Sequence, residues 1–290
     1  MVRLREFSQR YFRRPFNLNV ALDQGQGGKT VLLLHGLASN GLIWADLARR
    51  LSTKNYRVLA YDLLGFGGSA KPHWSKYSVE DHARSVVYSL KKSGATFPIT
   101  LVGHSMGCLV AIHIASKHPN LVERVILYEP PLFADIPEFS SHVRRRKVYF
   151  SVFERIVESP TMILTYVRLL GRAATKIAGF ALSKETWLPF ERSLRNTIMN
   201  QTAYQELHRL QVRTDIVYGR FDIVVTQTEI KSMFADNKNI HFYRVTDTHG
   251  VSKKSSEYLA QLVMGKKAPA RKARVAYVTR KRDNKRTRKV

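Results

Sequence analysis

Short apolar runs alternate with segments of helical periodicity through the first half of the chain. Residues 30–34, 57–61 and 99–102 have the length and the nearly continuous apolar character of strands that are buried on both faces. Helical spacing follows the first strand over 42–51, and a Ser-x-x-Asp capping pattern opens a second helix, predicted over 78–93. Strands and helices in this order predict a parallel sheet with helices on both of its faces.

The alternation breaks off after a strand predicted over 124–128. No strand pattern is recognisable between 132 and 210, where the periodicity predicts helices over 143–158, 161–182 and 189–207. Open α/β folds bind ligands at the carboxyl edge of the sheet, and both ends of this insertion lie beside that edge. We therefore expect the insertion to form a helical cap over it.

Strands resume at 214–218 and 240–245, with helices predicted near 226–234 and over 255–263. The expected fold class is therefore α/β, with a mostly parallel central sheet flanked by helices and an inserted helical cap. At 290 residues and 44% apolar composition, the chain is long enough to bury a full core.

Four segments are expected along the chain. Residues 1–131 and 211–265 form the core domain in two parts, and residues 132–210 form the cap. Residues 266–290 are rich in Lys and Arg and have no sustained apolar period, so we expect a disordered basic tail.

The net charge of the chain is +26. Residues 266–290 contain twelve Lys or Arg and one acid, Asp283, so this tail carries +11 and residues 1–265 carry +15. Such a field attracts polyanions without selecting among them. We expect the tail to contact nucleic acid or anionic membranes non-specifically.

The sequence disfavours several kinds of site and location. The single cysteine, Cys108, rules out an intrachain disulfide, and neither Cys-x-x-Cys nor His-Glu-x-x-His spacing occurs. No uncharged apolar run of about 18 residues is present, and the Arg-rich residues 1–14 lack the apolar stretch of a signal peptide. We expect a cytoplasmic protein that uses neither a metal nor an organic cofactor.

A Gly-His-Ser-Met-Gly pattern at 103–107 joins the strand predicted at 99–102 to an apolar helix. A serine on this sharp turn is held in a strained conformation with its hydroxyl at the sheet edge, and the flanking glycines avoid Cβ clashes. The helix start behind it offers backbone donors and a partial positive charge to a developing anion. We predict that Ser105 is a nucleophile.

A serine hydroxyl needs a base within hydrogen-bond reach, and that base needs an acid to orient it. Asp222 follows the strand predicted over 214–218, and His249 follows the strand over 240–245. A doubly wound sheet delivers both side chains to its carboxyl edge, in the order Ser, Asp, His of one hydrolase architecture.

Two other carboxylates are alternatives for the acid. Asp247 lies two residues before His249 on the same loop, and Glu129 ends the strand predicted over 124–128. His104, beside the nucleophile, is expected to pack or to form a structural hydrogen bond rather than to act as the base.

Five segments resemble the α/β-hydrolase superfamily, in particular its lid-bearing serine hydrolases. They are Leu-Leu-His-Gly-Leu at 33–37, Asp-Leu-Leu-Gly-Phe-Gly-Gly-Ser at 62–69, Gly-His-Ser-Met-Gly at 103–107, Tyr-Gly-Arg-Phe-Asp at 218–222 and Thr-His-Gly-Val at 248–251. The resemblance spans residues 17–264. It implies that Ser105 is the nucleophile, His249 the general base and then acid, and Asp222 the orienting carboxylate. It also implies an oxyanion hole formed by the backbone N–H groups of Leu37 and Met106.

The leading functional hypothesis is a serine hydrolase that cleaves a carboxylic ester through an acyl-enzyme. The apolar bias of residues 162–182 favours a small-molecule substrate with a hydrophobic acyl group. Alternatives on the same scaffold are a carbon–carbon bond hydrolase, a lipase, a perhydrolase and an aminopeptidase, because one fold hosts many chemistries. An alternative of another class is a non-catalytic protein that binds polyanions.

Overall fold

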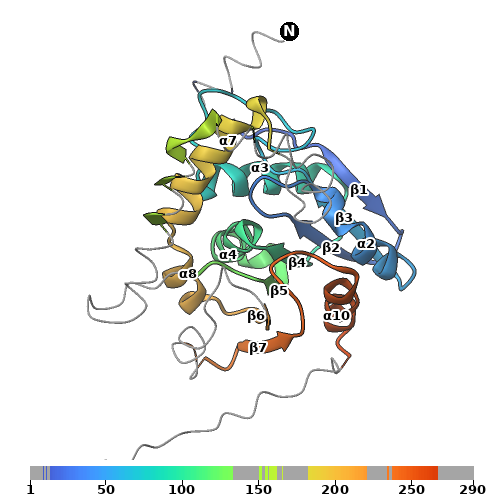
Figure 1. Ribbon diagram of the computed structural model, residues 1–290. Helices are drawn as coiled ribbons and strands as arrows, with labels where there is room; N and C mark the ends of the chain where they lie inside the picture. The colour runs from blue at the N-terminus through green and yellow to red at the C-terminus, as the bar shows by residue number, and fades with distance from the viewer. Residues whose placement is uncertain are drawn as a thin grey trace, which may run out of the picture.

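The computed structural model describes residues 14–132, 182–220 and 237–266, together with Gln9, Tyr11, Phe234 and scattered residues between 150 and 165. Within this part, a seven-stranded sheet has the order β1-β3-β2-β4-β5-β6-β7 (Figure 1). Its strands are β1 (Val20–Gln24), β2 (Lys29–Leu34), β3 (Tyr56–Tyr61), β4 (Ile99–His104), β5 (Val122–Tyr128), β6 (Arg213–Gly219) and β7 (Ile240–Val245). Only the β1–β3 pair is antiparallel among the described pairs, so the predicted, mostly parallel sheet is confirmed.

The strand predictions agree with β2 to β7 to within two residues at each end. The exception is β1, for which the sequence offers no prediction. Each residue of β1 is exposed or half-buried, because the strand lies at the sheet edge. It therefore lacks the continuous apolar run that identifies the buried strands.

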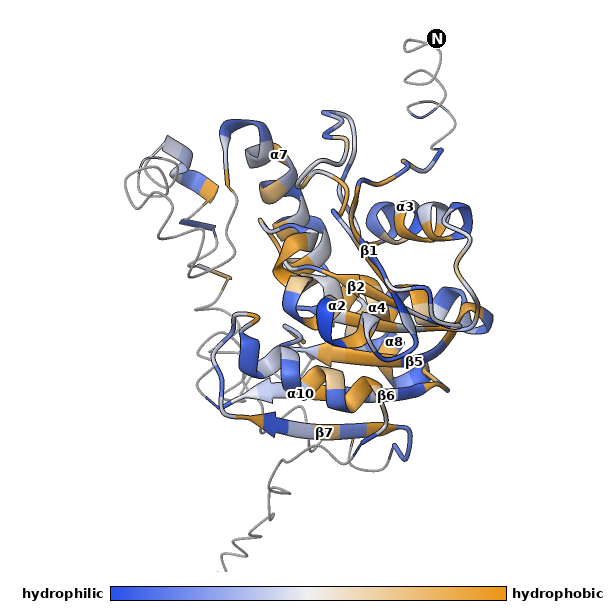
Figure 2. Cartoon of the chain, turned by 90° about the vertical axis from the view of Figure 1, so that its right-hand side faces the viewer, coloured by the Kyte–Doolittle hydropathy of each residue, from blue (hydrophilic) through white to orange (hydrophobic). Residues whose placement is uncertain are grey.

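Helices cover both faces of the sheet, and alternate side chains of each strand enter the two separate cores. On β2, for example, Leu32 and Leu34 contribute to one core, and Val31 and Leu33 to the other. Figure 2 shows hydrophobic residues along the central strands and mixed faces on α3 and α10. The first core also receives α3 (Val79–Lys92), α4 (Met106–Lys117) and α8 (Ala203–Arg209), and the second receives α2 (Ala45–Ser52) and α10 (Lys253–Val263).

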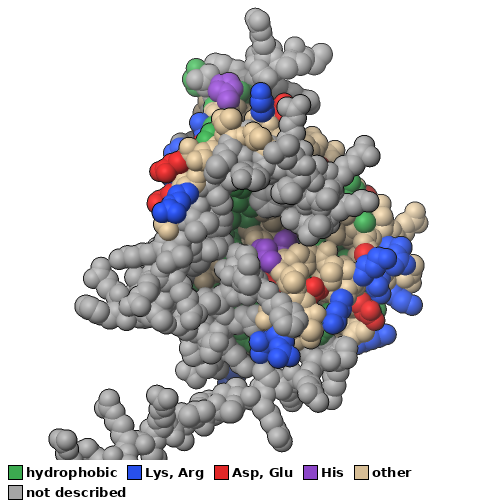
Figure 3. All heavy atoms as spheres, in the orientation of Figure 1, with side chains coloured by type: hydrophobic (Ala, Val, Ile, Leu, Met, Phe, Trp, Pro, Cys, Tyr) green, Lys and Arg blue, Asp and Glu red, His purple; other side chains and the backbone are tan. Residues whose placement is uncertain are grey.

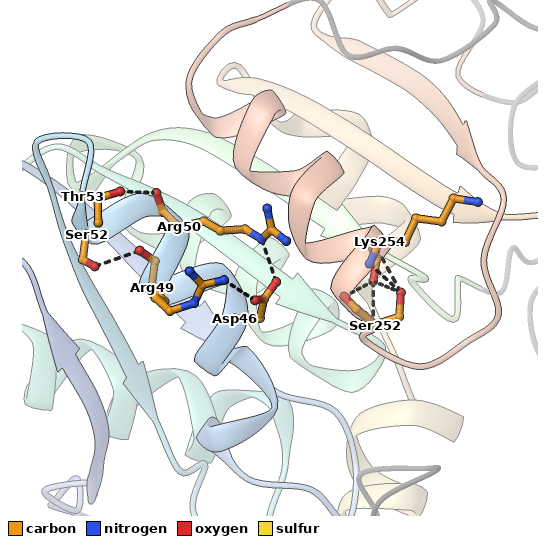
Figure 4. Close-up of polar contacts among 8 residues, drawn as sticks. Asp46, Arg49, Arg50, Ser52, Thr53, Ser252 and Lys254 are labelled. Carbon is orange, nitrogen blue, oxygen red and sulfur yellow. Dashed lines mark hydrogen bonds and ion pairs between the residues drawn. The ribbon is translucent and has the colours of Figure 1, made fainter.

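Side chains at two helix starts cap the first turn. The hydroxyl of Ser78 accepts a hydrogen bond from the N–H of Asp81, which confirms the predicted capping box of α3. At the start of α10, the hydroxyl of Ser252 accepts from the N–H groups of Lys254 and Ser255 (Figure 4). This end of α10 carries the loop that contains the predicted base, so its position is fixed locally.

Helix α2 packs against α10 on the second core face. Asp46 in its first turn accepts hydrogen bonds from Arg49 and Arg50 at 2.8 and 2.7 Å (Figure 4). These contacts are local to one helix, and the pair with Arg49 is largely exposed on the arginine side, so they contribute little to the free energy of unfolding.

Residues 182–210 are the longest continuous described part of the predicted cap. Helix α7 (Lys184–Ser193) runs directly into a π-helical turn, η3 (Leu194–Met199), and the chain leaves the helix at Asn200 before α8 begins. The single helix predicted over 189–207 is therefore wrong, because α7 begins earlier, at Lys184, and the backbone at Asn200 (φ −101°, ψ 49°) lies outside the helical region. The helices predicted over 161–182 and 226–234 fall largely outside the described residues, as does most of 143–158.

Hydrogen bonds tie this segment to the loop before α3. The guanidinium of Arg192 donates to the carbonyl oxygens of His73 and Ser75, both at 2.6 Å. The hydroxyl of Thr197 donates to the carbonyl of Tyr77 at 2.9 Å. The base of the predicted cap is thus fixed to the core by backbone acceptors. None of the described helices combines the length and the apolar composition needed to cross a membrane.

Candidate active site

Ser105 lies on the turn between β4 and α4, with φ +50° and ψ −120°. A positive φ is strained for a residue with a side chain, and such strain is common at functional sites. The two flanking glycines are required by close packing. A Cβ on Gly103 would lie 2.6 Å from the carbonyl oxygen of Gly107, and a Cβ on Gly107 would lie 2.4 Å from that of Leu34.

His249 lies on the loop between β7 and α10, and its Nε2 atom is 3.1 Å from Oγ of Ser105. The two residues are 144 positions apart in sequence. At this distance the serine hydroxyl can donate its proton to an unprotonated imidazole nitrogen. Figure 3 shows histidine side chains accessible near the centre of the viewed face. The structure thus brings together the predicted nucleophile and the predicted base.

Asp222, the predicted acid, lies outside the described residues, so its role stays a prediction. The alternative acid Asp247 has other partners. Its carboxylate accepts hydrogen bonds from the N–H of Thr248 at 2.9 Å and from the hydroxyl of Ser252. Both carboxylate oxygens of Asp247 therefore accept hydrogen bonds within the segment that leads into α10, and the choice between the candidate acids stays a prediction.

Glu129, the other alternative acid, follows β5 and is fully buried with φ +55°. Its carboxylate accepts a hydrogen bond from the N–H of Gly219, the last residue of β6. A Cβ on Gly219 would lie 2.5 Å from this carboxylate, so only glycine fits there. Glu129 therefore joins the carboxyl ends of β5 and β6, and Asp222 follows β6 by three residues.

The predicted oxyanion-hole residues Leu37 and Met106 lie on two segments that approach Ser105. Met106 is the first residue of α4, where backbone N–H groups lack intrahelical acceptors. Leu37 follows Gly36, and a Cβ on Gly36 would lie 3.1 Å from Cβ of Ser105. The loop that carries Leu37 is thus in contact with the nucleophile.

His35 fixes the orientation of the peptide that carries the Leu37 N–H. Its Nδ1 lies 2.7 Å from the carbonyl oxygen of Gly36, and its Nε2 accepts a hydrogen bond from the N–H of Leu63 at 2.8 Å. Burial lowers the pKa of His35 to about 4, so the ring is neutral with its proton on Nδ1. In a trans peptide the N–H points opposite to the C=O, so holding the Gly36 carbonyl also directs the Leu37 N–H.

Tyr128 contacts the loop that carries His249, and the sequence analysis did not identify this role. Its hydroxyl lies 3.2 Å from the carbonyl oxygen of Thr248 and 3.1 Å from that of Gly250, on either side of His249. In sequence it is one more aromatic residue in an apolar strand. The one sequence feature that could have indicated this role is its position. Tyr128 ends the strand that follows the Ser105 segment, so it lies at the carboxyl edge of the sheet.

Cys108, the single cysteine of the chain, lies on α4 close to the Ser105 turn. It is fully buried and donates to the carbonyl of Gly103 at 3.1 Å, so it packs as a small buried side chain. Burial also raises the pKa of its thiol. Among the residues that the structure describes, no group of three or more His, Cys, Asp or Glu side chains is arranged to hold a metal ion.

Comparison with known proteins gives a family match and several partial relatives. The family model for the alpha/beta hydrolase fold matches residues 29–262. The probable lysophospholipase BODYGUARD 4 of Arabidopsis thaliana is 36% identical over 124 residues, which cover 42% of this chain and 30% of that protein. BODYGUARD 5 from the same plant is 36% identical over 112 residues, 37% of this chain and 25% of its own length. The chain thus spans about a third or less of the length of these relatives.

Solved structures match nearly the whole fold at low sequence identity. An esterase from Exiguobacterium antarcticum has a TM-score of 0.68 at 17% identity, covering 87% of this chain and 98% of that chain. A bromoperoxidase from Bacillus anthracis has a TM-score of 0.66 at 20% identity, covering 84% and 92%. The thioesterase domain of the curacin biosynthetic pathway has a TM-score of 0.61 at 19% identity, covering 86% and 99%. These likenesses concern the fold.

Proposed function

The chain belongs to the α/β-hydrolase family, and from this premise we propose that it is a serine hydrolase that cleaves carboxylic esters through an acyl-enzyme. The observation that carries the proposal is the 3.1 Å approach of His249 Nε2 to Ser105 Oγ. A strained nucleophile at a helix start beside an imidazole is the arrangement that acyl transfer requires.

The first half-reaction follows from these positions. His249 takes the proton of Ser105 as Oγ attacks the ester carbonyl carbon, and a tetrahedral intermediate forms. Its oxyanion receives hydrogen bonds from the N–H groups of Leu37 and Met106, each contributing about 3 kcal/mol of transition-state stabilisation. When the carbon–oxygen bond breaks, His249 returns the proton to the leaving alcohol, and the acyl group stays on Oγ.

In the second half-reaction water takes the place of the alcohol. His249 removes a proton from the water as it attacks the acyl carbon, and the collapse of the second tetrahedral intermediate releases the carboxylic acid and restores the Ser105 hydroxyl. Asp222 would hold the imidazole in the required tautomer and stabilise the imidazolium that forms in each half-reaction.

The proposed substrate is a small ester with an apolar acyl group. The apolar bias of residues 162–182 supports it. The names of the plant relatives, probable lysophospholipases, and of the bacterial esterase support an ester as the bond cleaved. Nitrophenyl esters of graded chain length separate the possibilities: a short-chain esterase prefers acetate or butyrate, and a lipase or lysophospholipase prefers long acyl chains.

Labelling with a fluorophosphonate probe tests the proposal directly. The folded wild-type protein should be labelled at Ser105, and Ser105→Ala should abolish both labelling and ester hydrolysis. Ser116→Ala is a matched control, because Ser116 lies on α4 but away from the turn, and it should leave labelling unchanged. A folded wild-type protein that is not labelled, or a Ser105→Ala variant that still hydrolyses esters at the wild-type rate, contradicts the proposal.

The basic tail supports a separate proposal about partners. We propose that residues 266–290 contact anionic lipid or nucleic acid non-specifically through their twelve cations. Such binding weakens steeply with salt, because it releases counterions. Deleting residues 266–290 should therefore reduce binding to anionic vesicles or to DNA at low salt. Equal binding by the full-length and shortened proteins would rule out this role.

A further inference from the structure

We infer that His104 is a positioning residue that holds the His249 loop and the oxyanion loop against Ser105, with Tyr128 as a second anchor of the His249 loop. This inference rests on the proposed function of Ser105 and His249. It concerns two side chains that would not themselves react.

The His249 loop, residues 246–252, is held through three consecutive backbone carbonyls. The Nε2 of His104 lies 2.7 Å from the carbonyl oxygen of His249, and since a carbonyl only accepts, this nitrogen carries the proton and donates. The single O–H of Tyr128 lies within hydrogen-bond distance of the carbonyls on either side, those of Thr248 and Gly250, and shares its proton between them. The backbone that carries the predicted base is therefore fixed by side chains from outside its own loop.

The sheet topology explains why such anchors are needed. The His249 loop leaves β7, the edge strand, whereas Ser105 follows β4, and the order β4-β5-β6-β7 places two strands between them. With about 4.8 Å between neighbouring strands, the loop must reach back about 14 Å across the sheet. His104 and Tyr128 are the last residues of β4 and β5 and are paired in register, so both anchors lie where the loop must arrive.

The ring of His104 also contacts the oxyanion loop. A Cβ placed on Gly36 would lie 3.1 Å from Nδ1 of His104, so the ring packs directly against the glycine that precedes Leu37. The rings of Trp44, Tyr128 and His249 surround it, with centroids 6.4, 5.7 and 5.2 Å away. One side chain thus touches the nucleophile turn, the oxyanion loop and the base loop.

Two substitutions at His104 separate positioning from packing. His104→Leu removes the Nε2–H donor and keeps an apolar side chain among the surrounding aromatic rings. His104→Gln retains an N–H that can reach the His249 carbonyl. We expect His104→Leu to lower kcat by about 10- to 100-fold with little change in KM, because a displacement of about 1 Å at the reacting atoms has an effect of this size. His104→Gln should recover a large part of that loss.

Tyr128→Phe provides an independent test with little change in shape. It should lower kcat by a smaller factor, about 3- to 10-fold, because His104 still holds the loop. The matched control is Tyr61→Phe, which removes the hydroxyl of a buried tyrosine at the end of β3, a strand that β2 separates from β4 on the side of the sheet opposite to β7. This variant should keep the wild-type kcat.

The outcomes distinguish the inference from the proposed function. A folded wild-type protein without fluorophosphonate labelling at Ser105 removes the premise and with it the inference. If the wild type is labelled, equal kcat values for His104→Leu, His104→Gln and wild type overturn the inference alone, as does a KM effect without a kcat effect. If His104→Leu fails to fold, a kcat of Tyr128→Phe equal to that of Tyr61→Phe still overturns it.

Discussion

The Nε2 atom of His82, on the core helix α3, lies 3.1 Å from the hydroxyl oxygen of Ser193, the last residue of α7. Both side chains are fully buried, and within the described part of the chain Nδ1 of His82 has no hydrogen-bond partner. Burial, together with a smaller effect of the neighbouring His35, lowers the pKa of His82 to about 3. A neutral histidine therefore joins the core to the base of the predicted cap.

We predict that the free energy of unfolding decreases as the pH falls from about 6.5 toward 4. The folded-state pKa values of His82 and His35, about 3 and about 4, lie below the unfolded value of 6.5. The unfolded chain therefore binds protons in this range that the folded chain does not, and each histidine contributes a slope of up to about 1.4 kcal/mol per pH unit. Urea unfolding at several pH values measures the slope.

The contribution of His82 is isolated by substitution. His82→Gln should show a shallower pH dependence than the wild type, because one of the two protons is no longer taken up on unfolding. His73→Gln is the control, since His73 is exposed and should leave the slope unchanged. A His82→Gln slope identical to that of the wild type contradicts the prediction.

The buried carboxylate of Asp215 on β6 is predicted to be a major contributor to stability. It has no solvent exposure and bonds to Arg124 on β5 and to Arg213 on its own strand, while Arg124 also donates to the Leu262 carbonyl of α10. Asp215→Asn should reduce the free energy of unfolding by about 3–5 kcal/mol, because it leaves the half-buried guanidinium of Arg124 without its counter-charge.

An exposed pair of the same chemistry provides the comparison for Asp215. Asp23 on β1 pairs with Arg57 on β3 at 2.8 Å, but its side chain is 43% exposed. Asp23→Asn should reduce the free energy of unfolding by at most about 1 kcal/mol, because solvent screens the pair. Denaturant unfolding of both variants checks the contrast, and equal losses would show that burial does not set the energy of the Asp215 cluster.

The fold could be predicted where burial imposes a local pattern. Strands β2 and β4 are buried on both faces and read as apolar runs, and the glycine-flanked Ser105 marks the turn between β4 and α4. The approach of His249 to Ser105 could be anticipated because parallel strands present their carboxyl ends at one edge. The half-exposed β1 and the π-turn at 194–199 have no such local pattern, and sequence reasoning missed both.

The surroundings of the site were harder to predict than its reacting groups. Tyr128 acts on Thr248 and Gly250, 120 and 122 residues away, through strand register rather than through any local pattern. His35 orients the Gly36 peptide by a contact between adjacent residues, but its neutral form depends on burial that only the folded chain provides. Long-range packing decides these contacts, so spacing in the sequence does not reveal them.

Substitution of two carboxylates separates the candidate acids. Asp222→Asn should lower kcat by about 10³- to 10⁴-fold, because an acid that orients the imidazole has effects of this size when neutralised. Glu129→Gln should leave most of kcat but reduce the free energy of unfolding, since Glu129 is buried and accepts the N–H of Gly219. Ester hydrolysis measures kcat, and urea unfolding measures the free energy of unfolding, for both variants. The opposite pattern would assign the acid to Glu129.

The close packing of Gly36 against Ser105 predicts that a larger side chain at position 36 lowers activity for steric reasons. An added Cβ would lie 3.1 Å from both Ser105 Cβ and His104 Nδ1, so Gly36→Ala requires the oxyanion loop and these two side chains to separate by a few tenths of an ångström. We expect a folded variant with kcat lowered by up to about 10-fold, because the Leu37 N–H is displaced from its best alignment with the oxyanion. Gly28→Ala is the matched control, because its Cβ would meet no atom within 4 Å, and it should keep wild-type kcat. Wild-type ester hydrolysis by Gly36→Ala would mean that the loop at 35–37 does not supply an oxyanion donor.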